Sequence, residues 1–348
     1  WREASPLGQR AVRSFAAKEF AEIRYDTVQV LMMKAILVFF LCLFLQALAN
    51  GQKPLVVYTD PSQLVAIAKN ARVLEDEEHR FSPEAVWDME EGKFKSFDGK
   101  VLNFENTVSK FWVRFEVQNG TGETLYLILD NPEIQHLNVF VKDQQGQATA
   151  IKSGALTPFG TRSLSTTPFS FCLGSHPQSV LIEAKTYTGF TFPLTLGAIG
   201  PVVRLLHRTD QFNGAYIGIM LAMLLYNLFI FFSIRSRTYL YYTLYIGISA
   251  FMMLRFRGVG FDLFWPNLPA FNSGSNFFPC LTVISSVLFS THFLGMKEMT
   301  PRAYLYFWVL SAIAVVIIIT DQLHIQPYSN IAFQIVGGIT AISLLVTA

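Results

Sequence analysis

Five uncharged apolar segments in the second half of the chain constrain its fold more than any other feature. They contain no Asp, Glu, Lys or Arg, and they cover residues 212–234, 239–254, 276–294, 303–320 and 330–348. Each is close to the roughly 17–25 residues that a membrane-spanning helix requires. Buried helices of soluble proteins rarely follow one another without a single charge. We therefore predict an all-α transmembrane bundle over residues 206–348.

Composition supports this interpretation and excludes one class of partner. Of the 348 residues, 51% are hydrophobic and only 15% are charged, and the mean hydropathy is +0.36. Soluble domains carry about a quarter charged residues. The net charge of +2 provides no strong field for nucleic acid, so the lipid bilayer, and not nucleic acid, is the expected partner.

Few polar groups interrupt the predicted spans. No acid or base inside them suggests a proton relay or an ion pathway. Asn227 and His292 are expected to make hydrogen bonds between helices, and Gly214 and Gly218 form a GxxxG pattern that favours close helix contact.

The N-terminal part has the layout of a segment that directs export. Residues 1–31 are polar and are interpreted as upstream or disordered sequence. Residues 32–49 then combine Lys34, an apolar run at 35–45 and the small residues Ala47 and Ala49, which is typical of a signal peptide. An uncleaved anchor helix is the alternative. With a signal peptide, residues 50–205 are exported and the first span begins outside.

The exported part is predicted to be an all-β sandwich. Phe111, Val113, Phe115 and Val117 alternate with polar or aromatic residues, as in a strand buried on one face. A turn signal follows, and then an apolar run at residues 125–129, so the two runs are expected to pair as an antiparallel hairpin. Further strands are expected at residues 137–141, 169–172 and 180–185, and a short helix at Ser82 to Trp87.

No catalytic constellation stands out. Acidic residues cluster at 75–78 and at Asp88, Glu90 and Glu91, but such runs are more typical of a solvated loop than of a catalytic pair. Cys172 and Cys280 lack metal-site spacing and are interpreted as structural thiols. We expect no catalytic residue, no metal and no cofactor.

Three residues are the candidates for ligand binding. Trp112 and Tyr126 lie on the strand faces opposite the apolar rows, where an aromatic ring can stack on a sugar, and Arg114 is their polar neighbour. The alternative is that each aromatic ring covers the second sheet of the sandwich. The aromatic, Gly-rich loop at residues 258–267 suits the membrane interface and is placed to touch the exported domain.

The order of these parts resembles a known family. The matching strings are Phe111 to Phe115, Leu125 to Leu127 with Asn131-Pro132, Leu221 to Phe232, Ser236 to Tyr242 and Gly258 to Asn267. Residues 54–348 resemble the bacterial seven-transmembrane receptors with diverse intracellular signalling modules. The resemblance implies a periplasmic jelly-roll sensor domain, similar to carbohydrate-binding modules, and seven helices in the bacterial inner membrane. It also implies a cytoplasmic output module, such as a histidine kinase or a diguanylate cyclase.

The resulting hypothesis is a signal-transducing receptor. A small ligand, with saccharides as one class, binds the exported domain and changes the helix bundle. Because the chain stops at Ala348 in the fifth predicted span, two helices and the output module are expected beyond it. A homodimer is an open alternative to a monomer. The rival functions are a membrane transporter or channel component with an exported accessory domain, and an exported carbohydrate-active enzyme tethered by helices.

Overall fold

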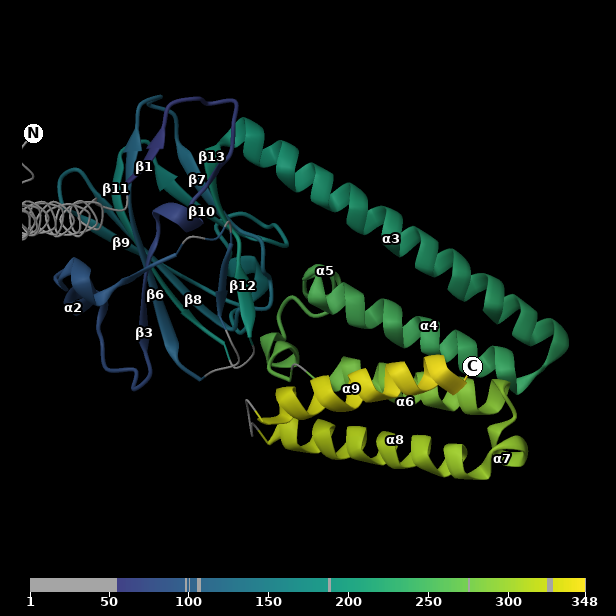
Figure 1. Ribbon diagram of the computed structural model, residues 1–348. Coiled ribbons are helices and arrows are strands. Elements are labelled where there is room, and N and C mark those ends of the chain that lie inside the picture. The colour runs from purple at the N-terminus through teal and green to yellow at the C-terminus, as the bar shows by residue number, and fades with distance from the viewer. Residues whose placement is uncertain are drawn as a thin grey trace, which may run out of the picture. The chain divides into compact units, whose positions relative to one another are not determined.

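The computed structural model describes residues 55–347 except 98, 100, 105–107, 187–188, 275 and 324–327. The predicted signal peptide at 32–49 and the polar segment before it lie outside the described residues. Residues 54–348 form one compact unit. Its strands come first along the chain and its long helices follow, which confirms the predicted order of fold classes (Figure 1).

The strands form two main sheets and one small one. The larger sheet has the order β4-β3-β6-β11-β8-β9, with β1 parallel to β6, and the second has the order β10-β7-β13-β2. A third sheet pairs β12 with β5. The strand bounds are β1 Leu55–Tyr58, β2 Val65–Ala66, β3 Arg72–Asp76, β4 Lys95–Ser96, β5 Leu102–Phe104, β6 Lys110–Asn119, β7 Leu125–Leu129, β8 His136–Asp143, β9 Ala148–Ser153, β10 Phe169–Gly174, β11 Pro177–Lys185, β12 Phe190–Phe192 and β13 Leu194–Ala198.

One hydrophobic core joins the two main sheets into a sandwich, called the β-domain below. The alternating residues of β6, such as Phe111 and Phe115, enter this core together with Leu127 of β7 and Phe169 of β10. The alternation therefore predicted the buried face of β6 correctly. Face-to-face packing of this kind excludes water from both apolar rows at once.

The predicted hairpin between β6 and β7 is wrong. β6 pairs with β11 and β3, whereas β7 pairs with β10 and β13 in the opposite sheet. The turn at residues 120–124 therefore carries the chain from one sheet to the other. In both strands the odd-numbered side chains are the buried apolar ones. Because the strands lie in opposite sheets, these two apolar rows face each other across the core; in a hairpin they would lie side by side on one sheet.

A short helix covers the outer face of the larger sheet. Helix α2 (Pro83–Trp87) begins where predicted, because the Ser82 hydroxyl accepts a hydrogen bond from the Ala85 amide at 3.3 Å and Pro83 takes the first position. Val86 then packs beneath the helix in a second apolar cluster with Trp112 and Leu181.

The C-terminal half is helical, and its first helix starts directly where β13 ends (Figure 1). Helices α4, α6, α8 and α9 pack against one another in chain order, with α6 also contacting α9. The helix bounds are α3 Ile199–Ile234, α4 Arg237–Phe256, α5 Val259–Leu263, α6 Phe277–Phe293, α7 Met296–Met299, α8 Pro301–Gln322 and α9 Tyr328–Thr347; the short 3-10 turns are η1 Ala68–Asn70, η2 Glu91–Lys93, η3 Phe159–Thr161 and η4 Pro269–Asn272.

The five predicted spans fall on α3, α4, α6, α8 and α9. Among the described residues, α3, α8 and α9 are long and apolar enough to cross a membrane, and α6 is a shorter apolar helix. Their exposed side chains are predominantly large and hydrophobic, as lipid contact requires.

Three expectations about the spans need correction. The Asn227 amide donates to the Met223 carbonyl at 2.8 Å, so it bonds within its own helix. His292 meets the ring of Tyr241 edge to face across α4 and α6 at 5.1 Å, which is an aromatic contact instead of the expected hydrogen bond. A Cβ at Gly214 or Gly218 would meet nothing within 4 Å, so the GxxxG pattern makes no close contact here. A chance GxxxG is common in apolar sequence, and the close α3–α4 approach lies instead at Gly247.

Candidate functional site

The predicted ligand residue Trp112 is buried and not exposed. Its side chain has 0% of its surface accessible and packs in the cluster beneath α2. Its indole nitrogen donates to the Asp76 carboxylate at 3.4 Å. Asp76 is itself buried and accepts from the amides of Arg80 and Phe81, so this member of the acidic run is structural and not solvated.

Arg114 is also buried, and it fixes the chain that follows α2. Its guanidinium donates to the carbonyls of Val86, Trp87 and Met89 at 3.1–3.3 Å. The guanidinium forms an ion pair with the Glu91 carboxylate at 2.9 Å. Its central carbon lies 4.1 Å from the centre of the Phe94 ring. These contacts give the carbonyls at and just beyond the helix C-terminus a charged donor, which is a positioning role.

The third candidate, Tyr126, lies in the other sheet. It is half-buried on β7, between Cys172 of β10 and Gly197 of β13. The structure therefore brings Trp112 and Arg114 together under α2 and leaves Tyr126 apart from them. The predicted exposure of Trp112 and Arg114 was wrong because the segment at residues 81–94 covers them, and a binding role for the three residues stays a prediction.

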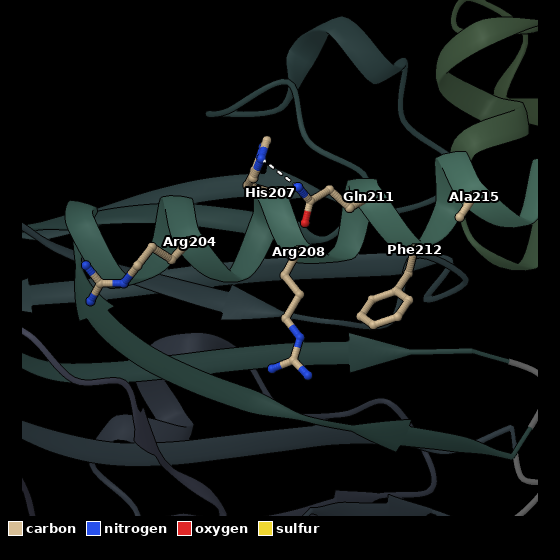
Figure 2. Close-up of a pocket in the computed structure, with 6 residues that line it drawn as sticks. All are labelled: Arg204, His207, Arg208, Gln211, Phe212 and Ala215. Atoms are coloured by element: carbon tan, nitrogen blue, oxygen red, sulfur yellow. Dashed lines mark hydrogen bonds between the residues drawn. The ribbon is translucent and has the colours of Figure 1, made fainter.

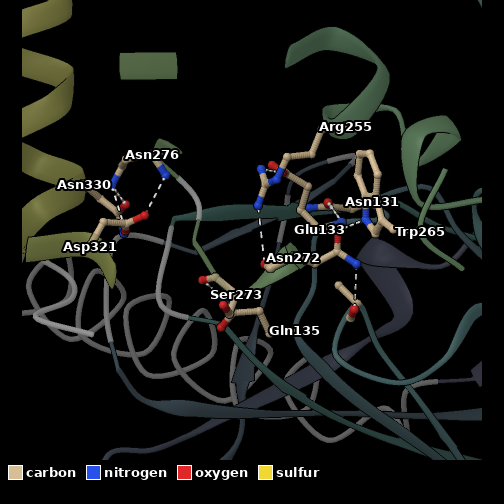
Figure 3. A network of polar contacts seen from close by, with 11 residues as sticks. Asn131, Glu133, Gln135, Arg255, Trp265, Asn272, Ser273, Asn276, Asp321 and Asn330 are labelled. Carbon is tan, nitrogen blue, oxygen red and sulfur yellow. Dashed lines mark hydrogen bonds and ion pairs between the residues drawn. The ribbon is translucent and has the colours of Figure 1, made fainter. Parts of the chain in front are cut away.

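A polar junction joins the β-domain to the helices, and it is the strongest candidate site for function. The carboxylate of Glu133, just before β8, accepts from the guanidinium of Arg255 near the end of α4 at 2.7 Å (Figure 3). The Arg255 side chain is 5% exposed and that of Glu133 is 36% exposed. Burial raises the pKa of the Glu133 carboxyl, and the charge of Arg255 opposes this rise.

Asn272 and Gln135 extend the junction on either side of this ion pair. The Asn272 amide donates to the Ala155 carbonyl of the β-domain at 2.9 Å and accepts from the indole of Trp265 at 3.0 Å. The Gln135 amide donates to the Ser273 carbonyl at 3.3 Å (Figure 3). The segment between α4 and α6 is thus tied to the β-domain at several independent points.

An aromatic cluster seals the same junction. Phe159 of the β-domain packs against Phe261 and Trp265, with the rings of Phe159 and Phe261 edge to face at 5.5 Å. The Phe159 amide donates to the Pro266 carbonyl at 2.9 Å. The loop at residues 258–267 therefore contacts the β-domain, as its position in the sequence predicted.

Arg162 is an unusual member of this cluster. Its guanidinium lies 4.3–4.4 Å from the ring centres of Phe159 and Phe169, and one nitrogen donates to the carbonyls of Thr166 and Thr167. Its Nε and Nη2 atoms are buried without a hydrogen-bond partner. Burial lowers the pKa of Arg162 to about 10, so it stays charged at neutral pH.

Several buried polar atoms of the junction lack partners. Besides Arg162, they include Oε1 of Gln135 and Nε of Arg255. An unpaired buried polar atom costs about 1–3 kcal/mol. Each such atom lowers the net stabilisation that the junction gains from its hydrogen bonds and its ion pair.

A second polar cluster lies at the adjoining ends of α6, α8 and α9. The fully buried carboxylate of Asp321 accepts from the backbone N–H of Asn276 at 3.0 Å and from the Ser329 hydroxyl at 3.4 Å. The Asn276 side chain also donates to Asn330 at 2.6 Å (Figure 3). The sequence analysis missed this cluster, although an acid one residue past an apolar run was the available signal.

Gly258 supports the junction through its backbone, and its replacement is a direct test of docking. Its φ is +73°, and a Cβ there would lie 2.7 Å from Cβ of Pro132 in the β-domain. We expect Gly258→Ala to lower the melting temperature and to speed hydrogen exchange of amides at residues 155–162. Backbone strain of about 1–2 kcal/mol accounts for part of the loss, and the Pro132 contact adds to it.

Gly295 provides the matched control for that test. It also begins a helix with positive φ, +58°, but a Cβ there would meet nothing within 4 Å. Gly295→Ala should therefore show the strain alone, with unchanged exchange at residues 155–162. Equal exchange in the two variants would show that Gly258 does not hold the junction together.

Comparison with known families matches both halves of the chain. The family model described as 7TM diverse intracellular signalling matches residues 209–348. The model described as 7TMR-DISM extracellular 2 matches residues 68–198. No curated protein matches the chain. The boundary between the two matches falls at the start of α3, where the β-domain passes directly into the helices.

Proposed function

The chain belongs to the 7TMR-DISM family of membrane signalling receptors, with an extracellular sensor domain, and we propose that this domain reports a small ligand through the junction described above. Saccharides are the ligand class that we propose, on the basis of the family resemblance; a β-sandwich is compatible with this class of ligand. The protein is a multi-pass membrane protein whose N-terminal domain is extracellular.

One observation carries the proposal: the β-domain contacts the α4–α6 connection directly. Glu133 and Arg255 are 122 residues apart in the chain and meet across this contact. A ligand can change the helices only if its affinity differs between two arrangements. We propose that the interface around the Glu133–Arg255 ion pair is the element that changes between the two arrangements. The proposed signal is a ligand-dependent change in docking at Glu133 and Arg255, passed along α4 toward intracellular signalling.

The test is a distance measurement across the helices. Spin labels at Arg235 and Met299, which are on the connections that follow α3 and α6, are placed on the full chain in nanodiscs. Addition of a panel of soluble mono- and oligosaccharides should change the distance distribution for at least one saccharide that binds. A saccharide that binds the β-domain and leaves the distance between these two labels unchanged would contradict the proposed relay.

The rival functions make different predictions. A transporter or channel component would move the same saccharides across proteoliposome membranes, whereas the receptor should produce no flux. We also propose that the described part of the chain has no catalytic activity. Turnover of a saccharide by the protein would overturn that proposal and favour a tethered enzyme.

A further inference from the structure

The extracellular end of α3 carries a cationic face that the receptor function does not use. Arg204, His207, Arg208 and Gln211 line a hollow of about 510 Å³ together with Phe212 and Ala215 (Figure 2). Helical periodicity places these residues within one face of α3, whereas Asp210, the acid of this segment, lies on the other side. Asp210 neighbours His207 at the edge of this face, but neither Arg204 nor Arg208 has a carboxylate three or four residues away on α3.

The depth of the two arginines relative to the membrane is set by the sequence of α3. The uncharged run begins at Phe212, and Arg208 precedes it by one turn, about 6 Å along the axis. Arg204 lies one further turn out. The headgroup zone of a bilayer extends roughly 5–8 Å beyond the hydrocarbon core on each side. The guanidinium of Arg208 is thus at headgroup depth, whereas Arg204 lies beyond this zone, where its guanidinium donates to the Ser62 carbonyl of the β-domain.

The positive charge at the extracellular end of α3 differs from the usual distribution of Arg and Lys in membrane proteins. Arginine and lysine are enriched on the cytoplasmic side of spanning helices, yet Arg204 and Arg208 lie on the extracellular side, next to the β-domain. In the described structure Arg208 contacts the Phe212 ring, 5.8 Å from its centre, and forms no ion pair, while Arg204 donates to the Ser62 carbonyl. The Arg208 guanidinium is therefore free to take an anion.

From this placement we propose that the face formed by Arg204, His207, Arg208 and Gln211 binds the phosphate headgroup of an anionic phospholipid in the outer leaflet. The Arg208 guanidinium contacts the phosphate, and the ring of Phe212 lies beside the acyl chains just below it. Arg204, bonded to the Ser62 carbonyl, adds positive charge at longer range, and the Gln211 amide and the His207 ring, which bond each other at 3.1 Å, form the polar edge of the site (Figure 2). Lipid is favoured over a soluble anion because Phe212 and Ala215, at the start of the apolar run, line the hollow together with the cationic residues. A bound headgroup would fix the depth of α3 in the bilayer.

The test uses the full chain in nanodiscs of phosphatidylcholine with and without phosphatidylglycerol, with bound lipid measured by native mass spectrometry. We expect the wild type to retain phosphatidylglycerol in preference to phosphatidylcholine. Arg208→Gln should reduce that preference about fivefold, and the Arg204→Gln/Arg208→Gln double variant should reduce it further. Arg208 makes no hydrogen bond to any residue that the structure describes, so the single variant should keep the wild-type melting temperature in phosphatidylcholine.

Two controls make the result specific. Asp210→Asn changes a charge in the same segment but on the other side of α3, and Arg237→Gln removes a cation beyond the opposite end of the helix. Both should keep the wild-type lipid preference. Equal retention of the two lipids by the wild type, or an unchanged preference in the double variant, would overturn the proposal. Full displacement of the lipid by soluble glycerol phosphate would also overturn it, because the site would then be one for a free anion.

Discussion

Replacing Trp112 with alanine is expected to lower the free energy of unfolding of the β-domain by about 3–5 kcal/mol, the range for removing a large buried aromatic side chain. Trp112 has no exposed surface and contacts Leu181 and Val86 beneath α2. The substitution also removes the indole donor of Asp76. The measurement is denaturation of the full chain in detergent, with hydrogen exchange at β6 and β11 reporting the β-domain specifically.

Two further variants separate a core role from a binding role. Trp112→Phe keeps most of the buried apolar surface and should recover more than half of the lost stability. Tyr126→Ala removes a half-buried ring from the other sheet and should cost less than Trp112→Ala. A Trp112→Ala protein that stays as stable as the wild type but no longer binds a saccharide would restore Trp112 as a surface binding residue.

The behaviour of Trp112 illustrates what periodicity can and cannot predict. Alternation along β6 correctly assigned Phe111 and Phe115 to one buried face, because side-chain direction in a strand follows position alone. It carried no information about the other face of β6. That face is covered by the segment around α2, whose sequence has no regular hydrophobic alternation. It also could not choose the partner strand, so β6 and β7 were paired in error.

The junction was predictable only in outline. The aromatic loop at residues 258–267 was correctly placed against the exported domain from its order in the chain. The individual partners were not predictable, because Asn272 reaches Ala155 across 117 residues and no local pattern encodes such a pairing. The burial of Arg114 and Arg162 was not predictable for a related reason. An arginine in a sequence normally indicates a charge at the surface. The carbonyls and aromatic rings that allow these two arginines to be buried come from other elements.

The ion pair of Glu133 and Arg255 should have a measurable coupling energy. Glu133→Ala leaves the Arg255 guanidinium, 5% exposed, without its carboxylate. Breaking a fully buried ion pair costs about 3–5 kcal/mol, and because Glu133 is 36% exposed we expect a smaller loss, about 2–3 kcal/mol. The loss should appear as faster hydrogen exchange at residues 265–273, while the exchange of β6 and β11 in the sandwich core stays unchanged.

A double-mutant cycle with Arg255→Met isolates the pair from the rest of the junction. Methionine fills part of the arginine volume without a charge, so the Glu133→Ala/Arg255→Met protein should dock better than Glu133→Ala alone. Glu123→Ala, in the 120–124 turn, is the control and should leave exchange at the junction unchanged. If the pair also carries the signal, Glu133→Ala should abolish the saccharide-dependent distance change while saccharide affinity is retained. Additive effects of the two substitutions would show that the ion pair does not hold the β-domain on the helices, and the aromatic cluster around Phe159 and Trp265 would then be the coupling element.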